Sequence, residues 1–98
     1  MSVPPKFRDR DTEQFADGEH VRRLAGVPRR RSNIALDRID QATRLIDLRD
    51  LPGNHFEKLS GDRAGQYSIW INDQWRVCFE WPGGSREPFN IEIVDYHD

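Results

Sequence analysis

The chain has 98 residues, enough for one domain, because a chain this short cannot divide into two self-sufficient cores. Only 36% of its residues are apolar, but these include three Trp, two Tyr and five Phe, whose large side chains bury much apolar surface per residue. The single cysteine, Cys78, excludes an internal disulfide or a cysteine-rich metal site, and no apolar run is long enough for a signal peptide or a membrane span. We therefore expect one cytoplasmic domain over residues 1–98.

The charge is unevenly distributed, although the formal net charge is only −2. Residues 1–50 contain eleven Lys and Arg against nine Asp and Glu, whereas residues 51–98 contain four against eight. A nucleic-acid-binding protein usually has a clear positive excess, so any RNA contact here must depend on a local basic patch. Arg29–Arg31 is the densest basic run, and it is either a solvated face or a sign of an external anionic partner.

The first third of the chain predicts short helical pieces. Two prolines make residues 1–6 an extended or loose end. A short helix is expected over Phe7–Phe15, and Asp17-Gly18 is expected to end it. His20–Leu24 is predicted to form another short turn.

The strongest predicted helix follows Pro28, a residue that suits a first helical turn because its missing N–H is not needed there. One apolar stripe recurs at helical spacing over the following residues, namely Ala35, Ile39, Ala42 and Ile46. We expect this stripe to pack on a sheet.

After Leu51 the apolar period changes from helical to alternating, which predicts strands joined by short turns. The expected strands are His55–Leu59, Tyr67–Ile71, Trp75–Trp81 and Phe89–Val94. The turn residues between them are Gly61–Gly65, Asn72-Asp73 and Pro82–Ser85. The fold class is therefore α+β, with N-terminal helices packed on a small twisted antiparallel sheet.

Three blocks of this region, residues 61–69, 72–79 and 93–97, resemble the core of the HigB-like killer proteins in the RelE/ParE superfamily. The similarity covers roughly residues 7–97. It implies a RelE-like toxin fold and a toxin of a type II toxin–antitoxin system that cleaves mRNA on the translating ribosome, without a metal ion or other cofactor. It also implies a helix-turn-helix (HigA-like) antitoxin as partner. The chain departs from the family at Ser60, commonly a lysine, and at Trp70, commonly an arginine, and both departures remove phosphate-contacting charge.

Cleavage of RNA by its own 2′-OH needs a base, a cation for the developing phosphorane charge, and an acid for the leaving oxygen. His97 is the natural proton carrier, because the unperturbed pKa of histidine is about 6.5. Asp95 can orient His97 or contact the substrate, and Tyr96 can donate to the RNA or stack on it. Arg76 points away from the core side of its strand, so its guanidinium can fork onto a phosphate.

The resemblance also suggests roles for residues outside this motif. Glu57 is a further catalytic candidate, at a position that is His in some relatives and Glu in others. Lys58 and Arg63 are expected to contact RNA. Trp70, on the strand face opposite Tyr67, is our candidate contact for the antitoxin.

Each assignment has an alternative. His97 can belong to a solvated tail, Tyr96 can be a packing residue, and Arg76 can pair with Glu80 or Glu92 across strands. Cys78 reads as a structural cysteine. The spacing of the histidines predicts no metal site. Two other functions also remain open: a ParE-like toxin that inhibits DNA gyrase without RNA chemistry, and a degenerate toxin that retains only antitoxin binding.

Overall fold

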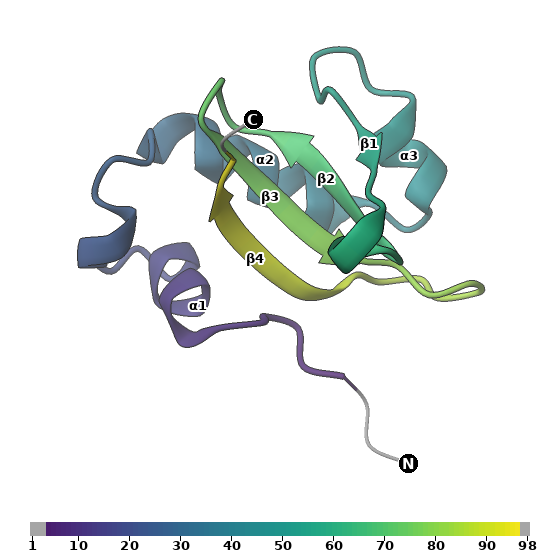
Figure 1. Ribbon diagram of the computed structural model, residues 1–98, viewed down its shortest axis with the longest axis horizontal. Helices are drawn as coiled ribbons and strands as arrows, with labels where there is room; N and C mark the ends of the chain where they lie inside the picture. Colours follow the sequence, from purple (N-terminus) through teal and green to yellow (C-terminus); the bar gives the residue numbers. More distant parts are fainter. Residues whose placement is uncertain (1–3, 97–98) are drawn as a thin grey trace.

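The computed structural model describes residues 4–96, which build an antiparallel sheet with helices on one face. The strands follow sequence order and are β1 (Glu57–Lys58), β2 (Gln66–Trp70), β3 (Trp75–Glu80) and β4 (Phe89–Asp95). The helices are α1 (Arg10–Ala16), α2 (Arg29–Gln41) and α3 (Leu45–Arg49), with 3₁₀ turns η1 (Arg22–Leu24) and η2 (Gly61–Arg63). Figure 1 shows α2 behind the sheet and α1 beside β4. This arrangement confirms the predicted α+β fold class.

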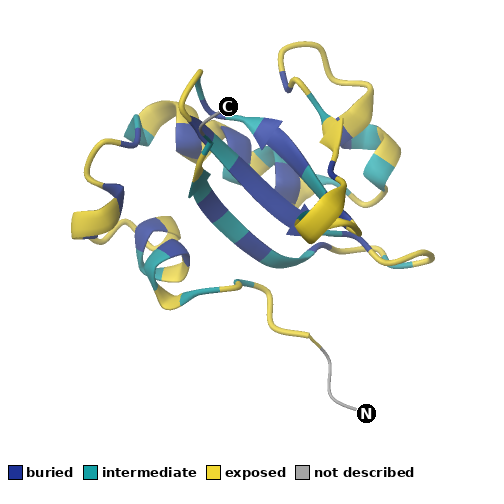
Figure 2. Ribbon diagram, viewed as in Figure 1, coloured by how far each residue is buried: buried dark blue, intermediate teal, exposed yellow. Residues whose placement is uncertain are grey.

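The core lies between α2 and the sheet, where Figure 2 shows buried residues along the central strands. Ala35 and Ile39 of α2 belong to one buried cluster with Val77 and Phe79 of β3. Ile39, Val77 and Phe79 have no exposed surface. The predicted packing of the first half of the α2 stripe on the sheet is therefore confirmed.

The N-terminal segment covers the outer edge of β4. Phe7 forms a parallel bridge with Ile91, so the prediction of a helix from Phe7 is wrong in its first turn. The helix begins later because the Asp9 carboxylate accepts a hydrogen bond from the Thr12 backbone N–H at 2.7 Å and caps α1. The buried Thr12 hydroxyl in turn accepts from the backbone N–H of Ile93 at 3.1 Å. This edge strand is thus partly shielded from pairing with another chain.

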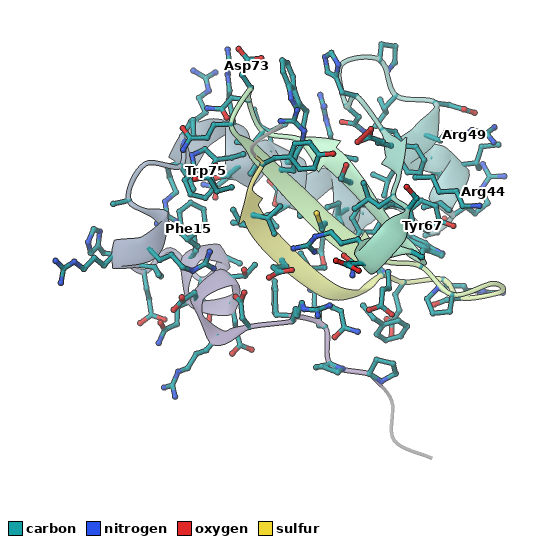
Figure 3. The ribbon with its side chains drawn as sticks, viewed as in Figure 1. Phe15, Arg44, Arg49, Tyr67, Asp73 and Trp75 are labelled. Carbon is teal, nitrogen blue, oxygen red and sulfur yellow. The ribbon has the colours of Figure 1, made fainter. Side chains whose placement is uncertain are left out.

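The prediction that the apolar stripe continues on one helix through Ala42 to Ile46 is wrong beyond Ala42, which still packs against the core. Ala42 is extended at φ −70° and ψ 136°, and the following helix, α3, carries an Ile46 that is 37% exposed. The break is stabilised by Asp47, whose carboxylate accepts from the backbone N–H of Arg44 at 3.1 Å and from its guanidinium at 3.0 Å. Desolvation raises the pKa of the Asp47 carboxyl, but these hydrogen bonds outweigh it and keep the pKa below its ordinary value of 3.8. Figure 3 shows Arg44, the residue before α3, and Arg49, the last residue of α3, at the margin of the molecule.

The first strand is shorter than predicted, because His55 does not belong to it. His55 has a φ of +46°, outside the β region, and its ring contacts that of Trp70 with centroids 4.1 Å apart. The predicted turn between β2 and β3 is confirmed, since the Asn72 side chain accepts from the backbone N–H of Gln74 and of Trp75 at 2.9 and 2.8 Å. Asp73 lies at the tip of this turn (Figure 3). Within residues 4–96 no helix has the length and apolar character to cross a bilayer.

Candidate active site

The face of the sheet opposite α2 carries polar residues at its centre. Ser68 of β2 lies between Glu57 of β1 and Cys78 of β3, and Cys78 pairs in turn with Glu92 of β4. Ser68 and Cys78 are fully buried although no helix of the α2 layer covers this face. Side chains from the sheet margins, among them Arg63, must therefore close over them. We call this surface the open face.

Several predicted site residues meet in one hollow at the edge of the open face, with a volume of ≈ 210 Å³. Its lining combines β1, the following turn and Tyr96, because the Tyr96 ring lies against Arg76 on the open face although β4 and β1 are opposite edges of the sheet. The residues are Glu57, Lys58, Leu59, Ser60, Asp62, Arg63 and Tyr96. The sequence predicted a role for four of these: Glu57, Lys58, Arg63 and Tyr96. We call this hollow the Tyr96 cavity.

The charges around the Tyr96 cavity nearly balance. Lys58 and Arg63 are matched in number by Glu57 and Asp62, and Ser60 contributes no charge. The Arg63 guanidinium also donates to Gln66 at 3.0 Å and to Glu92 at 3.2 Å. Its charge is therefore shared with a carboxylate before any ligand binds.

Arg76 is held in place by two backbone carbonyls and two aromatic rings. Its Nη1 donates to the backbone carbonyl of Asn72 and, at 3.3 Å, to that of Trp75. Its guanidinium carbon lies 5.2 Å from the centroid of the Trp70 ring and 5.0 Å from that of Tyr96. The expected alternative, an ion pair with Glu80 or Glu92, is absent, and no carboxylate among residues 4–96 forms an ion pair with Arg76.

The C-terminal motif is divided between the two sides of β4. Tyr96 lines the cavity and lies against Arg76, and its backbone N–H donates to Gln74 O at 2.6 Å. Asp95 pairs in register with Trp75, a residue of the core side, and its carboxylate accepts from the Gln74 amide at 3.2 Å. Adjacent strand residues point to opposite faces, so Asp95 and Tyr96 point apart. His97, the predicted proton carrier, lies outside the described residues.

Cys78 is not a nucleophile in this structure. Burial raises the pKa of its thiol to about 11, despite the opposing influence of Arg63, and the side chain has no exposed surface. The structural interpretation of this cysteine is therefore confirmed. Residues 4–96 contain no group of three or more His, Cys, Asp or Glu side chains placed to hold a metal ion.

Sequence reasoning missed Asn54, which organises the loop before β1. Asn54 is 1% exposed; its amide donates to Leu48 O at 3.0 Å and accepts from Arg38 at 2.7 Å. Its backbone carbonyl also accepts from the N–H of Trp70 at 2.7 Å. It thereby ties α2, α3 and β2 together and places His55 against Trp70. The sequence signal was only a turn-forming Gly53-Asn54, which does not reveal tertiary partners.

Comparison with known proteins places the chain in a family. The model of the family described as RelE-like toxin of type II toxin-antitoxin system HigB matches residues 5–97. Toxin HigB-1 of Vibrio cholerae serotype O1 is 38% identical over 82 residues, covering 81% of this chain and 84% of the relative. Endoribonuclease HigB of Proteus vulgaris is 38% identical over 77 residues, covering 74% and 79%. The YoeB-YefM complex from Staphylococcus aureus shares the fold, with a TM-score of 0.55 and 18% identity over the full length of both chains. The chain therefore belongs to the HigB family of RelE-like toxins of type II toxin–antitoxin systems.

Proposed function

We propose that this toxin is an endoribonuclease that cleaves mRNA on the translating ribosome, and that an antitoxin keeps it inactive. The observation that carries the proposal is the setting of Arg76, a fixed guanidinium beside the Tyr96 cavity without a carboxylate partner among the described residues. The name of the Proteus vulgaris relative, an endoribonuclease, supports the same reaction. An mRNA substrate on the ribosome also implies that the toxin acts in the cytoplasm.

The proposed reaction uses the RNA as its own nucleophile, without a metal ion. A base removes the 2′-OH proton, the 2′-oxygen bonds to the adjacent phosphorus, and the bond from phosphorus to the 5′-oxygen breaks. An acid then gives a proton to that 5′-oxygen, leaving a 2′,3′-cyclic phosphate on one product. His97 is the proposed proton carrier, and Glu57, on the wall of the cavity, is a second group for proton transfer.

Arg76 is proposed to stabilise the negative charge that develops on the phosphorane. Its two backbone carbonyl partners and its two flanking rings fix the guanidinium before substrate binds, so little reorganisation opposes catalysis. Tyr96, adjacent to both the cavity and Arg76, is placed to donate to the RNA or to stack on it. Asp95 points away from the cavity, which favours a role in holding the C-terminal segment through Gln74 rather than in contacting RNA.

Lys58 and Arg63 are proposed to contact the RNA backbone from the other side of the cavity. Their contribution is limited by the neighbouring Asp62 and by the ion pair of Arg63 with Glu92. Ser60 lies on the same wall, where the family resemblance leads us to expect a lysine. This weak positive charge favours an activity below that of family members with the lysine, and it is the reason to retain a degenerate toxin as the second candidate.

The partner that follows from the family is an antitoxin, and we propose one of the helix-turn-helix class. Trp70 remains the predicted contact, because its half-buried ring reaches the surface beside Arg76. An antitoxin covering Trp70 obstructs Arg76 at the same time. Neutralisation then needs no change in the fold of the toxin.

The test is induced expression in a bacterial host, with mapping of mRNA 5′ ends for the parent chain and for His97→Ala at matched protein levels. One acid–base group contributes about 10²–10⁴ in rate, so His97→Ala is expected to abolish cleavage and growth arrest. Full cleavage by His97→Ala shows that the C-terminal motif has no catalytic role. Growth arrest by the parent without cleavage assigns the protein to the gyrase-inhibiting class, and neither effect assigns it to the degenerate class.

A further inference from the structure

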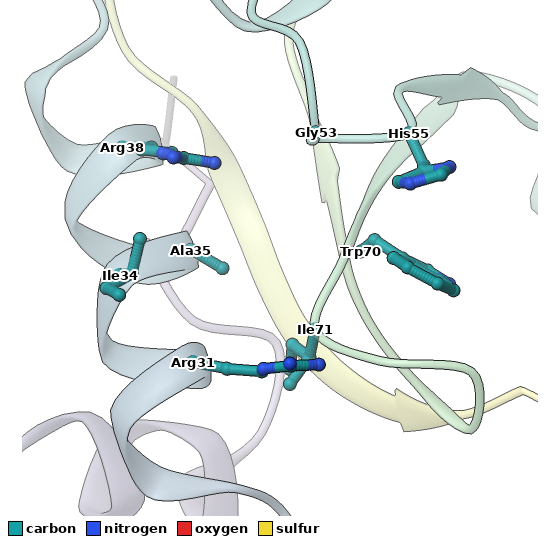
Figure 4. Close-up of a pocket in the computed structure, with 8 residues that line it drawn as sticks. All are labelled: Arg31, Ile34, Ala35, Arg38, Gly53, His55, Trp70 and Ile71. Carbon is teal, nitrogen blue, oxygen red and sulfur yellow. The ribbon is translucent and has the colours of Figure 1, made fainter.

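A second hollow lies beside the candidate active site, between α2 and the segment that leads into β1. Its volume is ≈ 340 Å³, at the lower end of the roughly 300–1,000 Å³ common for ligand sites. Figure 4 shows side chains from α2 on one side and from the loop before β1 and the end of β2 on the other. The lining residues are Arg31, Ile34, Ala35, Arg38, Gly53, His55, Trp70 and Ile71. We call this hollow the α2 groove.

The α2 groove suits an anionic ligand. Arg31 and Arg38 both point from α2 toward the opposite wall (Figure 4), and no Asp or Glu is among the described residues that line it. Nor does any carboxylate within residues 4–96 form an ion pair with either arginine. One guanidinium nitrogen of Arg38 donates to Asn54 at 2.7 Å, which fixes its direction. The charge of the groove is thus available to a bound molecule.

A row of planar groups joins the α2 groove to the Tyr96 cavity. The ring centroids of His55 and Trp70 are 4.1 Å apart. The guanidinium carbon of Arg76 lies 5.2 Å from the Trp70 ring centroid and 5.0 Å from that of Tyr96. His55 is the exposed end of this row, and its backbone is held at φ +46° by the anchored Asn54 before it. Aromatic side chains beside cationic ones form a surface on which unpaired bases stack.

We propose that the α2 groove binds one unpaired nucleotide of the RNA substrate, next to the segment being cleaved. Its base stacks on the His55–Trp70 pair, and a phosphate lies at Arg31 and Arg38. This subsite rests on the proposed function, because it extends the RNA path from the Tyr96 cavity across Arg76. An acidic antitoxin segment fits the charge equally well, but the continuous row of planar groups through Arg76 favours RNA.

The proposal is tested by binding of a fluorescent single-stranded oligoribonucleotide whose 2′-OH groups are methylated, so that it cannot be cleaved. The variants are Arg31→Ala and His55→Ala, neither of which alters a proposed catalytic residue. Arg30→Ala is the matched control, because Arg30 is an exposed arginine of α2 that does not line the groove. Circular dichroism checks that each variant keeps its helices and strands.

We expect His55→Ala to weaken binding about 5- to 150-fold, the loss equivalent to one base-stacking contact. Arg31→Ala should weaken binding and reduce the slope of log affinity against log salt concentration by about 0.7, the loss of one phosphate contact on a single strand. Arg30→Ala should bind as the parent does.

Three results overturn the subsite. The first is equal binding by the parent, Arg31→Ala and His55→Ala, and the second is an equal loss for Arg30→Ala. The third is weakened antitoxin binding with unchanged RNA binding, which assigns the α2 groove to the antitoxin. Cleavage of mRNA by the parent in translating extracts is measured in parallel. If the parent cleaves mRNA and Arg31→Ala binds the oligoribonucleotide as the parent does, the subsite is refuted and the proposed function stands. If the parent does not cleave mRNA but Arg31→Ala and His55→Ala weaken oligoribonucleotide binding, the proposed function is refuted and the subsite stands.

Discussion

Replacement of Arg76 separates the charge of this side chain from its shape. Arg76→Ala removes the cation that faces the proposed phosphorane, and loss of one such stabilising donor costs about 10²–10³ in rate. Arg76→Lys keeps a positive charge, but a lysine ammonium cannot reproduce the planar guanidinium between Trp70 and Tyr96 with its carbonyl partners behind it. We therefore expect Arg76→Lys to cleave at a rate between those of the parent and of Arg76→Ala.

The assay is cleavage of a reporter mRNA in a translating extract, with growth arrest measured at matched protein levels. Arg86→Ala serves as the control, since Arg86 is an exposed arginine of the β3–β4 connection away from the cavity. Arg76 is half-buried and its charged guanidinium donates to backbone carbonyls, so its removal should lower the free energy of unfolding by about 1.5–3 kcal/mol. Cleavage by Arg76→Ala at the parental rate refutes its role, and unfolding of that variant makes Arg76→Lys the deciding measurement.

Further predictions concern the core, the partner and the cysteine. Phe79 is fully buried, so Phe79→Ala should lower the free energy of unfolding by roughly 3–5 kcal/mol, and an unchanged thermal melt contradicts this core. Trp70→Ala should weaken antitoxin binding in a pull-down or titration, because aromatic anchors dominate many interfaces; undiminished affinity removes Trp70 from that role. Cys78 should resist alkylation at pH 8 until the chain unfolds. Folding raises the pKa of the Cys78 thiol from 9.0 to about 11, so the stabilisation of the parent relative to Cys78→Ser is complete below pH 9 and is lost as pH rises to about 11. A difference in free energy of unfolding between the two chains that does not change with pH contradicts the burial of the thiol.

Local patterns were sufficient for most of the fold. The alternation around Val77 and Phe79 predicted β3 and its buried face, and the Asn72-Asp73 pair predicted the turn before it, because these signals depend on neighbours along the chain. The helix stripe failed after α2 for the opposite reason. Its spacing continued to Ile46, but the hydrogen bonds between Arg44 and Asp47 start a new helix there, and spacing alone does not weigh such competing local bonds.

By itself, the sequence determined the fold class, the family and the residue types able to transfer a proton or hold a phosphate. Only the tertiary structure decided which of them meet. Glu57 and Tyr96 are far apart in the chain and belong to opposite edges of the sheet, yet they line one cavity because Tyr96 lies against Arg76 on the open face. Arg76 forms no ion pair among the described residues, because Glu92 forms its ion pairs with Arg63 and Arg8 instead. Such pairings depend on distances across the folded chain, and a linear sequence does not contain those distances.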